Sequence, residues 1–446
     1  MKLIFLSLFF MSNIFAQDIS IVAVGKANLQ KEKVHIEDAS VDGNFSPTEL
    51  KSLKDIFTTM RNDFLFYKSK FDVVTNNNVS AKNQSADYKL WDSKGVAYLL
   101  KTHAVKSLDQ KISLSITGYN ITERKKVFES TEQLNLNLRE LAHKISNGFY
   151  GSITGKRSIF TSRIIFVSDS ASQNLPLKSR FKEMYIMDFD GGNVRRLTFH
   201  KGTVISPAIS YDGKRVLYTL IKMTQTRRGK RRDTSLYMMD LDTGKSEVIS
   251  NKKGINSGAV FLPDNEHIIM TLSHVGNAEL FKMNLKTKTL TRITRSGSAD
   301  VDPSISADGT ILAFLSDRPG KPMIYTLDPR GQEQSVKRIS FVGQFNATPR
   351  FAPSGTEIAF SSWLDNRFDI FKINADGSGL ARLTQDFGSN EDPTYSPDGE
   401  FIAFSSQRVI NRKKAVQNIY IMDKEGEILG QITKSFGNCI TPRWSK

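Results

Sequence analysis

Short apolar runs separated by turn residues fill the chain from residue 163 onward. In residues 391–408, "EDPTYSPDGEFIAFSSQR", a proline is followed by a short strand, a Pro-Asp-Gly turn and the apolar run "FIAFSS". The turn residues, together with the β-branched and aromatic positions, predict a β-hairpin. A second hairpin follows in residues 418–433, "NIYIMDKEGEILGQIT". The pattern therefore predicts units of four short antiparallel strands.

The same unit recurs along this part of the chain. Its first turn falls at positions that are 52, 44, 46 and 44 residues apart, namely Asp212, Asp264, Asp308, Ser354 and Asp398. A repeat of this length indicates a solenoid or a β-propeller, and four antiparallel strands make one propeller blade. Residues 163–199 supply strands two to four of a blade, and "TPRWSK" at 441–446 supplies a first strand. We therefore expect six blades, with the last one shared between the two ends so that no strand edge is left open.

The region before the repeats follows a different period. Ser46 is predicted as a helix N-cap, with Pro47 at the first helical position and Glu49 completing a capping box. Apolar residues at helical spacing then form one predicted inner face: Leu50, Leu53, Phe57, Met60 and Phe64. Strands are predicted at 71–75, 95–100 and 111–119, and a second helix at 137–154, capped by Gly155. The predicted fold class is an α/β N-terminal domain, residues 17–155, followed by an all-β six-bladed β-propeller, residues 163–446, closed by the C-terminal strand.

The first residues carry a targeting signal. Lys2 precedes the apolar run "LIFLSLFFM", and "NIFAQD" fits cleavage after Ala16, so residues 1–16 are predicted to be a secretory signal peptide. No later apolar stretch reaches the length of a spanning helix, so we expect no transmembrane segment in the mature chain. The only cysteine, Cys439, has no partner for an internal disulfide, and the fold is expected to depend on core packing. The chain is therefore predicted to be exported.

The chain is strongly basic, with a formal net charge of +16. Such a charge suits anionic surfaces or acidic proteins, and export makes nucleic acid a poor candidate partner. We expect a monomer.

Three motifs resemble catalytic or metal sites and do not fit them. "GSITGKRS" (151–158) lacks the first glycine and the final Ser or Thr of a phosphate loop, "LDTG" (241–244) falls at a repeat turn, and "DFDGGN" (188–193) lacks the glutamate that closes a calcium loop. The six histidines show no metal-ligand spacing, and no nucleophile elbow is present. The sequence therefore predicts no enzyme, no catalytic residue, no metal and no cofactor. An exported propeller hydrolase with a noncontiguous site, or a propeller that binds a cation or glycan, remains the alternative.

Two groups of residues are candidate binding elements on one face of the ring. This face carries the blade-to-blade connections and the hairpins between second and third strands, three of which read as long loops (170–183, 221–234 and 407–418). The second of these loops is rich in cations, among them Arg227, Arg228 and Arg231. They form a predicted basic rim for a partner, or a solvated charged loop.

The second group lies three residues before the repeat proline or its replacement Ala259. It comprises Asn256, Asp300, Asn346 and Asn390, with Val204 and Cys439 at the two remaining positions. The register predicts that these residues lie near the mouth of the central channel. They are interpreted as binding a partner, water or a cation, or as capping turns through their own side chains.

Nearly the whole mature chain resembles the TolB family, the periplasmic propeller proteins of the Tol-Pal system. The most specific part is the junction "AHKISNGFYGSITGKRSIFTSRIIFVSDS" (142–170), which matches the family's Ala-His helix, its Leu-Thr-Gly-like turn and the strand that opens the ring. The resemblance implies a non-catalytic scaffold that links a peptidoglycan-associated outer-membrane lipoprotein, Pal, with inner-membrane Tol proteins. It implies a role in envelope integrity and in outer-membrane constriction during cell division.

The resemblance also implies where partners bind. A Pal-like lipoprotein would meet the connections around Ile255 and Asn256 and their counterparts in neighbouring blades. A TolA-like protein would meet the extreme mature N-terminus, residues 17–24, including Ile19, Ile21 and Val22. Where familiar members of the family carry His in the first of these connections, this chain has Ile255, and its basic hairpins are a second departure from the family.

Overall fold

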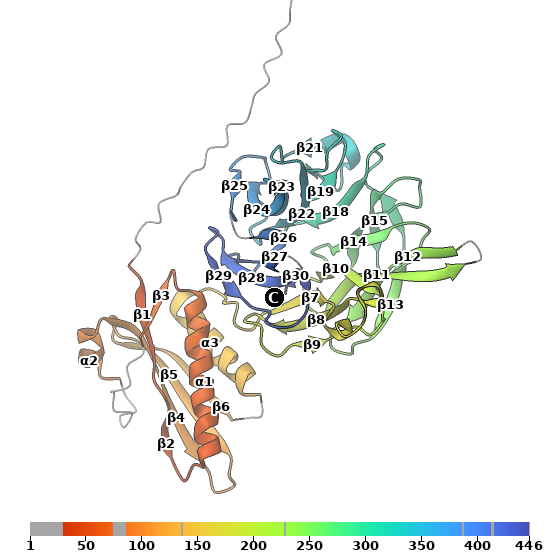
Figure 1. Ribbon diagram of the computed structural model, residues 1–446. Helices are drawn as coiled ribbons and strands as arrows, with labels where there is room; N and C mark the ends of the chain where they lie inside the picture. Colours follow the sequence, from red (N-terminus) through yellow and green to blue (C-terminus); the bar gives the residue numbers. More distant parts are fainter. Residues whose placement is uncertain are drawn as a thin grey trace, which may run out of the picture.

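The computed structural model describes residues 30–74, 86–134, 137–226, 229–385, 388–411 and 414–445. It consists of a small α/β unit packed against a ring of six four-stranded sheets (Figure 1). The predicted fold class is therefore confirmed.

The α/β unit is one mixed sheet with two long helices on one face. Strand β1 pairs in parallel with β3 and β4, β4–β5–β6 is antiparallel, and the short β2 pairs with β4. The elements are β1 (Glu32–Ile36), β2 (Ser40–Asp42), α1 (Pro47–Phe66), β3 (Phe71–Val74), α2 (Tyr88–Ser93), β4 (Val96–Lys106), β5 (Ile112–Asn120), β6 (Lys125–Gln133) and α3 (Leu138–Thr154).

Both long helices begin and end where their sequences indicate. The Ser46 hydroxyl accepts from the Glu49 amide at 3.3 Å, while the Ser46 amide donates to the Glu49 carboxylate at 2.7 Å, so the capping box is present. Gly155 ends α3 in the left-handed conformation with φ of 67°, as predicted. The predicted inner face of α1 is wrong only at Leu50, which is 45% exposed because it lies in the first turn, beyond the reach of α3.

The six sheets follow one another around the ring, and each is numbered here as a blade. Blade 1 consists of β10 (Thr203–Ile209), β11 (Arg215–Thr226), β12 (Gly229–Asp240) and β13 (Ser246–Ser250). Blade 2 consists of β14 (Asn256–Phe261), β15 (His267–Leu272), β16 (Glu279–Asn284) and β17 (Leu290–Arg292). Blade 3 consists of β18 (Asp300–Ile305), β19 (Leu312–Ser316), β20 (Met323–Leu327) and β21 (Lys337–Arg338). Blade 4 consists of β22 (Phe345–Phe351), β23 (Glu357–Leu364), β24 (Arg367–Asn374) and β25 (Ala381–Arg382). Blade 5 consists of β26 (Ser389–Tyr395), β27 (Phe401–Asn411), β28 (Lys414–Asp423) and β29 (Ile428–Gln431).

Blade 6 closes the ring with strands from both ends of the repeat region. Its order is β30 (Cys439–Trp444), β7 (Arg163–Ser168), β8 (Glu183–Asp188) and β9 (Arg195–Arg196), with β30 antiparallel to β7. The Trp444 indole donates to the Ser162 hydroxyl at 2.8 Å. Residues 439–440 and 443–444 therefore pair with β7, the strand that the sequence indicated.

Buried carboxylates fasten the outer strand of three blades. All three are fully buried. Glu183 and Glu279 are the first residues of the third strand of their blades, and Asp369 is the third residue of β24. Glu279 shows the pattern: Thr294 Oγ1 donates to it at 2.6 Å and Arg292 Nη2 at 3.0 Å, both from the end of the fourth strand. Since a buried charge is stable only when it is paired, these contacts fix where each fourth strand ends and the next connection begins.

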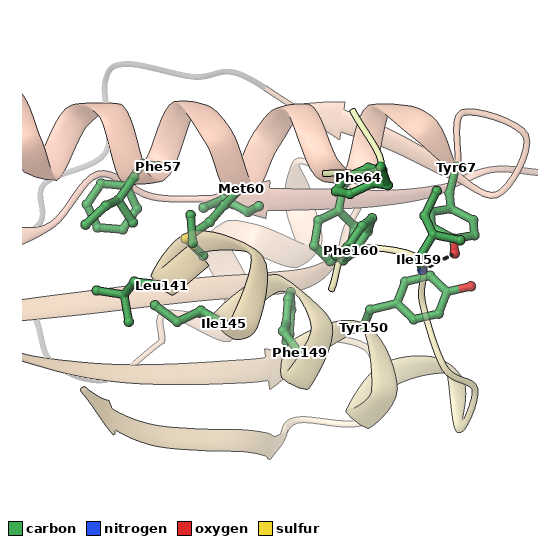
Figure 2. Close-up of a cluster of buried hydrophobic side chains, with 14 of the residues drawn as sticks. Phe57, Met60, Phe64, Tyr67, Leu141, Ile145, Phe149, Tyr150, Ile159 and Phe160 are labelled. Atoms are coloured by element: carbon green, nitrogen blue, oxygen red, sulfur yellow. Dashed lines mark hydrogen bonds between the residues drawn. The ribbon is translucent and has the colours of Figure 1, made fainter. Parts of the chain in front are cut away.

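The α/β unit and the ring share one apolar core. Phe57, Met60, Phe64 and Tyr67 of α1 face side chains of α3, and Ile159 and Phe160 of the linker complete the cluster (Figure 2). The same cluster continues into blades 5 and 6 through Phe401 and Trp444. At its edge the Tyr67 hydroxyl donates to Asp398 at 2.6 Å and accepts from the Ile159 amide at 3.1 Å.

Candidate functional site: the connection face and the central channel

The first strand of every blade carries a β-bulge at the same place. The pairing register of the first and second strands shifts in all six blades, just before or at the repeat proline. One residue in each bulge has φ between 49° and 57°, namely Ser206, Gly258, Asp302, Thr348, Asp392 and Thr441. A bulge bends the strand and redirects a side chain. Here it turns six equivalent residues toward the axis of the ring.

These six residues line a central cavity of about 220 Å³. Ile255 and Thr271 of blade 2 and two arginines, Arg350 and Arg443, also border it. The cavity therefore opens beside the connection between blades 1 and 2.

Charges of opposite sign alternate around half of the channel. Asp302, Arg350, Asp392 and Arg443 come from blades 3, 4, 5 and 6 in turn, and Arg350 Nη2 lies 3.0 Å from Asp302 Oδ1. Burial, together with the neighbouring Arg350, lowers the pKa of Arg443 to about 9. Burial and the charge of Asp392 raise the pKa of Glu391, the next residue along blade 5, to about 7. The wall of the channel thus holds charges of opposite sign close together, an arrangement that can bind polar groups through charge-assisted hydrogen bonds.

The four predicted channel-mouth residues lie behind the surface. Asn256, Asp300, Asn346 and Asn390 are all fully buried, as are Val204 and Cys439. Asn256 holds its connection together: it accepts from the Lys252 amide at 2.9 Å and donates to the carbonyl oxygens of Lys252 and Thr234 at 2.6 Å and 3.0 Å.

The other three residues of this set make similar internal contacts. Asp300 accepts from Arg318 at 2.7 Å, Asn346 donates to Ser340 at 2.8 Å, and Asn390 donates to Thr384 at 3.2 Å. The interpretation of these residues as caps of their connections accounts for the contacts observed. Any effect on a partner would pass through the backbone that they hold.

In two of the four connections the residue before the cap is exposed. Ile255 is 40% exposed, and Phe345, at the same repeat position in blade 4, is 38% exposed. Phe345 belongs to an aromatic cluster with Phe368 and Trp363. The ring centroid of Phe368 lies 5.9 Å from that of Phe345 and 5.0 Å from that of Trp363. The three aromatic residues are distant in the repeat pattern, and the one sequence signal for an apolar site here is the repeat position that Phe345 shares with Ile255.

The described parts of two of the three predicted long loops are strands. Residues 221–226 pair with 229–234, and 407–411 pair with 414–417, as continuations of β11–β12 and β27–β28. Their β-branched residues support extended backbone. The third, residues 170–183, contains two short 3₁₀ turns, Ser170–Ser172 and Leu177–Ser179.

One of the three predicted basic-rim residues can be placed. Arg231 is exposed on β12, with its Nε 2.6 Å from Asp233 Oδ1. Arg227 and Arg228, the segment with Ile19, Ile21 and Val22, and the signal peptide all lie outside the described residues.

One buried group has the composition of a metal site. Asp63 of α1, His143 of α3 and Asp190 of the β8–β9 turn bring their polar atoms within 4.8 Å of one another. His143 Nδ1 lies 2.9 Å from Asp63 Oδ1, and His143 Nε2 lies 3.9 Å from Asp190 Oδ2. Arg139 already donates to that same Asp190 oxygen at 2.5 Å. Because the guanidinium supplies the positive charge, the group fits an ionic clasp between α3 and blade 6 better than a metal centre.

Across the residues that the structure describes, no helix is both long and apolar enough to cross a membrane.

The molecule is a ring of six blades that is closed by its last strand and has a polar central channel. An N-terminal α/β unit shares the core of blades 5 and 6. These features define a two-part β-propeller protein. The sequence model described as TolB beta propeller domain matches residues 150–446, and the chain belongs to this family. It is similar to the Tol-Pal system protein TolB of Francisella tularensis subsp. tularensis (strain FSC 198), at 27% identity over 99% of this chain and 97% of the relative. The protein of the same description from subsp. holarctica (strain OSU18) is also 27% identical, over 99% and 98%. The crystal structure of TolB from Acinetobacter baumannii shares the fold, with a TM-score of 0.74 at 23% identity over 93% of this chain and 97% of that one.

Proposed function

We propose that this protein is a non-catalytic periplasmic scaffold of the Tol-Pal system. It links a Pal-like, peptidoglycan-associated outer-membrane lipoprotein with a TolA-like inner-membrane protein, and so supports envelope integrity and outer-membrane constriction during cell division. The match of the propeller to the TolB family over residues 150–446 carries the proposal. The full-length similarity to proteins described as Tol-Pal system protein TolB supports the same role.

The connection face is the proposed Pal-binding surface. Ile255 is exposed and borders the channel, and the buried Asn256, Asp300, Asn346 and Asn390 hold the connections in place around it. Apolar anchors near the centre of an interface supply most of its energy, whereas charges at the rim set the encounter rate. In this proposal Ile255 is an anchor, Arg227, Arg228 and Arg231 steer an acidic partner, and residues 17–24 with Ile19, Ile21 and Val22 bind the TolA-like protein.

Surface plasmon resonance against the native Pal homologue tests the binding face. Ile255→Asp should raise the dissociation rate by about tenfold or more, because it places a charge in the apolar centre of the interface. Val248→Asp is the matched control: Val248 is an exposed β-branched residue, 47% exposed, on the outer strand β13. Arg231→Ser should mainly slow association at low salt.

The opposite face of the ring provides the contradicting outcome. If Ile255→Asp binds with unchanged kinetics while Asp308→Lys, in a turn on the other face, abolishes binding, the wrong side of the ring has been assigned. If the unaltered protein shows no binding to the Pal homologue, the proposed function itself fails.

A further inference from the structure

The central channel contains two carboxylate–arginine pairs at equivalent repeat positions, and only one of them is closed. Asp302 is the bulge residue of blade 3, and Arg350 follows the repeat proline of blade 4. Arg350 Nη2 lies 3.0 Å from Asp302 Oδ1. Asp392 and Arg443 hold the same two positions in blades 5 and 6. The structure describes both of these residues, and they form no ion pair with each other. Asp392 and Arg443 are named here the open pair.

Arg443 is buried in the channel with donors left over. It is 8% exposed, and its Nη1 donates to the Pro442 carbonyl oxygen at 2.7 Å, as Arg350 Nη1 does to Pro349 at 2.6 Å. Among the described residues this is the hydrogen bond that the Arg443 guanidinium makes, so Nε and Nη2 can still donate to an acceptor. Because a buried charge without a partner is costly, an acceptor that reached these two nitrogens would be bound favourably.

The carboxylate of the open pair has the complementary requirement. Burial raises the pKa of Asp392, while the positive charges of Arg443 and Arg350 and the Thr441 backbone oppose the rise. The amide of Asp392 donates to Ser361 Oγ at 3.1 Å, which fixes the backbone and leaves the carboxylate directed to the channel wall. A cationic donor in contact with this carboxylate would stabilise its charged form.

The cavity beside the open pair has the size and access of a small-molecule site. Its volume is about 220 Å³, and residues from all six blades line it. Pockets for drug-sized ligands measure about 300–1,000 Å³, so this one admits only a smaller molecule. Ile255, which is exposed, borders the cavity, so a ligand can enter from the connection face. Ser206 of blade 1, the neighbour of blade 6, adds a hydroxyl that has no hydrogen-bond partner among the described residues.

The charges of the lining select the class of ligand. The charged residues that line the cavity are Asp302, Arg350, Asp392 and Arg443, and their charges sum to zero. A lone cation at Asp392 would be repelled by Arg443, and a lone anion at Arg443 would be repelled by Asp392. A molecule that carries an ammonium and a carboxylate group satisfies both members of the open pair at once.

We propose that the central channel binds a small zwitterion, of the class of the free α-amino acids, between Asp392 and Arg443. The ligand carboxylate accepts from Arg443 Nε and Nη2 and from the Ser206 hydroxyl, and the ligand ammonium donates to the Asp392 carboxylate. This site goes beyond the proposed scaffold role, because it takes a small molecule and needs no protein partner. The bound ligand completes between blades 5 and 6 the ion pairing that blades 3 and 4 make on their own.

Isothermal titration calorimetry of the full mature chain tests the class of ligand. Glycine and L-alanine should bind in the millimolar range or more tightly. Acetate and methylammonium each carry one of the two charges, so at the same ionic strength they should bind at least about tenfold more weakly.

Two substitutions in the open pair should change which probe is preferred. Asp392→Asn suits the left-handed backbone at this position and removes the negative charge beside Arg443. Glycine binding should therefore fall by about tenfold or more, while acetate binding should become stronger. Arg443→Gln should instead weaken glycine and strengthen methylammonium. Structural damage alone would not produce opposite changes for two probes.

A substitution outside the open pair gives an independent measure. Ser206→Ala removes one hydroxyl without a protein partner, so it should weaken glycine binding by about threefold to tenfold and leave the melting temperature of the ligand-free chain unchanged. Ser435→Ala is the matched control, because Ser435 also has a left-handed backbone, with φ of 53° against 51° at Ser206, and does not line the cavity.

The contradicting outcomes are equally specific. The zwitterion site is wrong if the unaltered chain binds neither glycine nor L-alanine at millimolar concentration, or if acetate, methylammonium or calcium chloride binds as tightly as they do. It is also wrong if Asp392→Asn and Arg443→Gln leave the preference for glycine over acetate and methylammonium unchanged, or if Ser206→Ala behaves like Ser435→Ala. These results leave the proposed function untouched, since that is tested by resonance binding of the Pal homologue.

Discussion

At the scale of single residues, the most consistent feature is the left-handed backbone at the bulge of each blade. Five of the six positions carry a residue other than glycine, with Ser206, Thr348 and Thr441 among them. This conformation costs a non-glycine residue about 1–2 kcal/mol. This cost arises at five positions, where the bulge aims a polar side chain into the channel and a regular strand would place it in the blade.

A glycine at another turn gives a sharp residue-scale prediction. Gly191, with φ of 89°, lies in the β8–β9 turn, and an added Cβ would come within 2.2 Å of the Ile432 carbonyl oxygen of blade 5. Gly244, with φ of 69°, has open space around it. Gly244→Ala should cost about 1 kcal/mol from backbone strain alone, and Gly191→Ala about 2–3 kcal/mol more, since backbone atoms must shift. Urea unfolding of both variants measures the difference, and equal losses would refute the clash.

Some residue roles followed from local chemistry and others did not. The capping roles of Ser46, Glu49 and Gly155 could be predicted because each involves neighbours within a few positions in the chain. The burial of Asn256 could not, since its side chain reaches back to Thr234 on another strand. The repeat register identified Asn256 as one of a set of equivalent positions and left its depth undetermined.

At the scale of elements, the contact between α1, α3 and the β8–β9 turn joins the two parts of the molecule. Although burial alone would lower the pKa of His143, the hydrogen bond and charge of Asp63, together with Asp190, hold it above its ordinary value. Asp188 and Arg139 are the other charged groups that face this contact. The charged histidine thus connects a helix to a blade.

This contact gives a pH-dependent prediction. A histidine whose pKa is raised on folding contributes stability that is complete below its unfolded pKa of about 6.5 and is lost as the pH rises through the folded pKa. His143→Gln should therefore remove a decline in the free energy of unfolding that begins above about pH 6.5. Asp190→Asn should make the decline smaller. Urea unfolding across a pH series measures it, and an unchanged pH profile in His143→Gln would contradict the clasp.

Elements also show where sequence patterns reach their limit. The repeat predicted every blade, because hairpins are local and their turns recur. The strands β1 and β2 could not be predicted, since parallel pairing such as β1 with β4 joins residues about 60 positions apart. The local strand β6 is concealed by its many charged residues. Basic residues also conceal the alternation at the ends of β11–β12 and β27–β28, where the sequence predicts loops.

At the scale of the whole molecule, the closure of blade 6 determines whether the ring is continuous. Trp444 is 9% exposed, packs in the core shared with the α/β unit and donates to Ser162. Trp444→Ala should lower the free energy of unfolding by about 3–5 kcal/mol, the usual cost of emptying a buried aromatic site. Trp363, 36% exposed on blade 4, is the matched control and should cost much less.

Truncation extends this prediction to the strand itself. Deleting residues 441–446 removes most of β30 and leaves β7 with an unpaired edge, so the melting temperature should fall sharply and aggregation should increase. Differential scanning calorimetry reports both. A truncated protein that melts like the full chain would show that blade 6 does not depend on β30.

The shared blade also has a consequence for the order of events during biogenesis. The contacts that seal the ring join residues 282 positions apart, such as Trp444 and Ser162. Contacts of such long separation form slowly, because a large loop must close before they are made. Until β30 has been synthesised, the sheets of the first blades can form, but the ring cannot close. The propeller therefore acquires its final rigidity only when β30 pairs with β7.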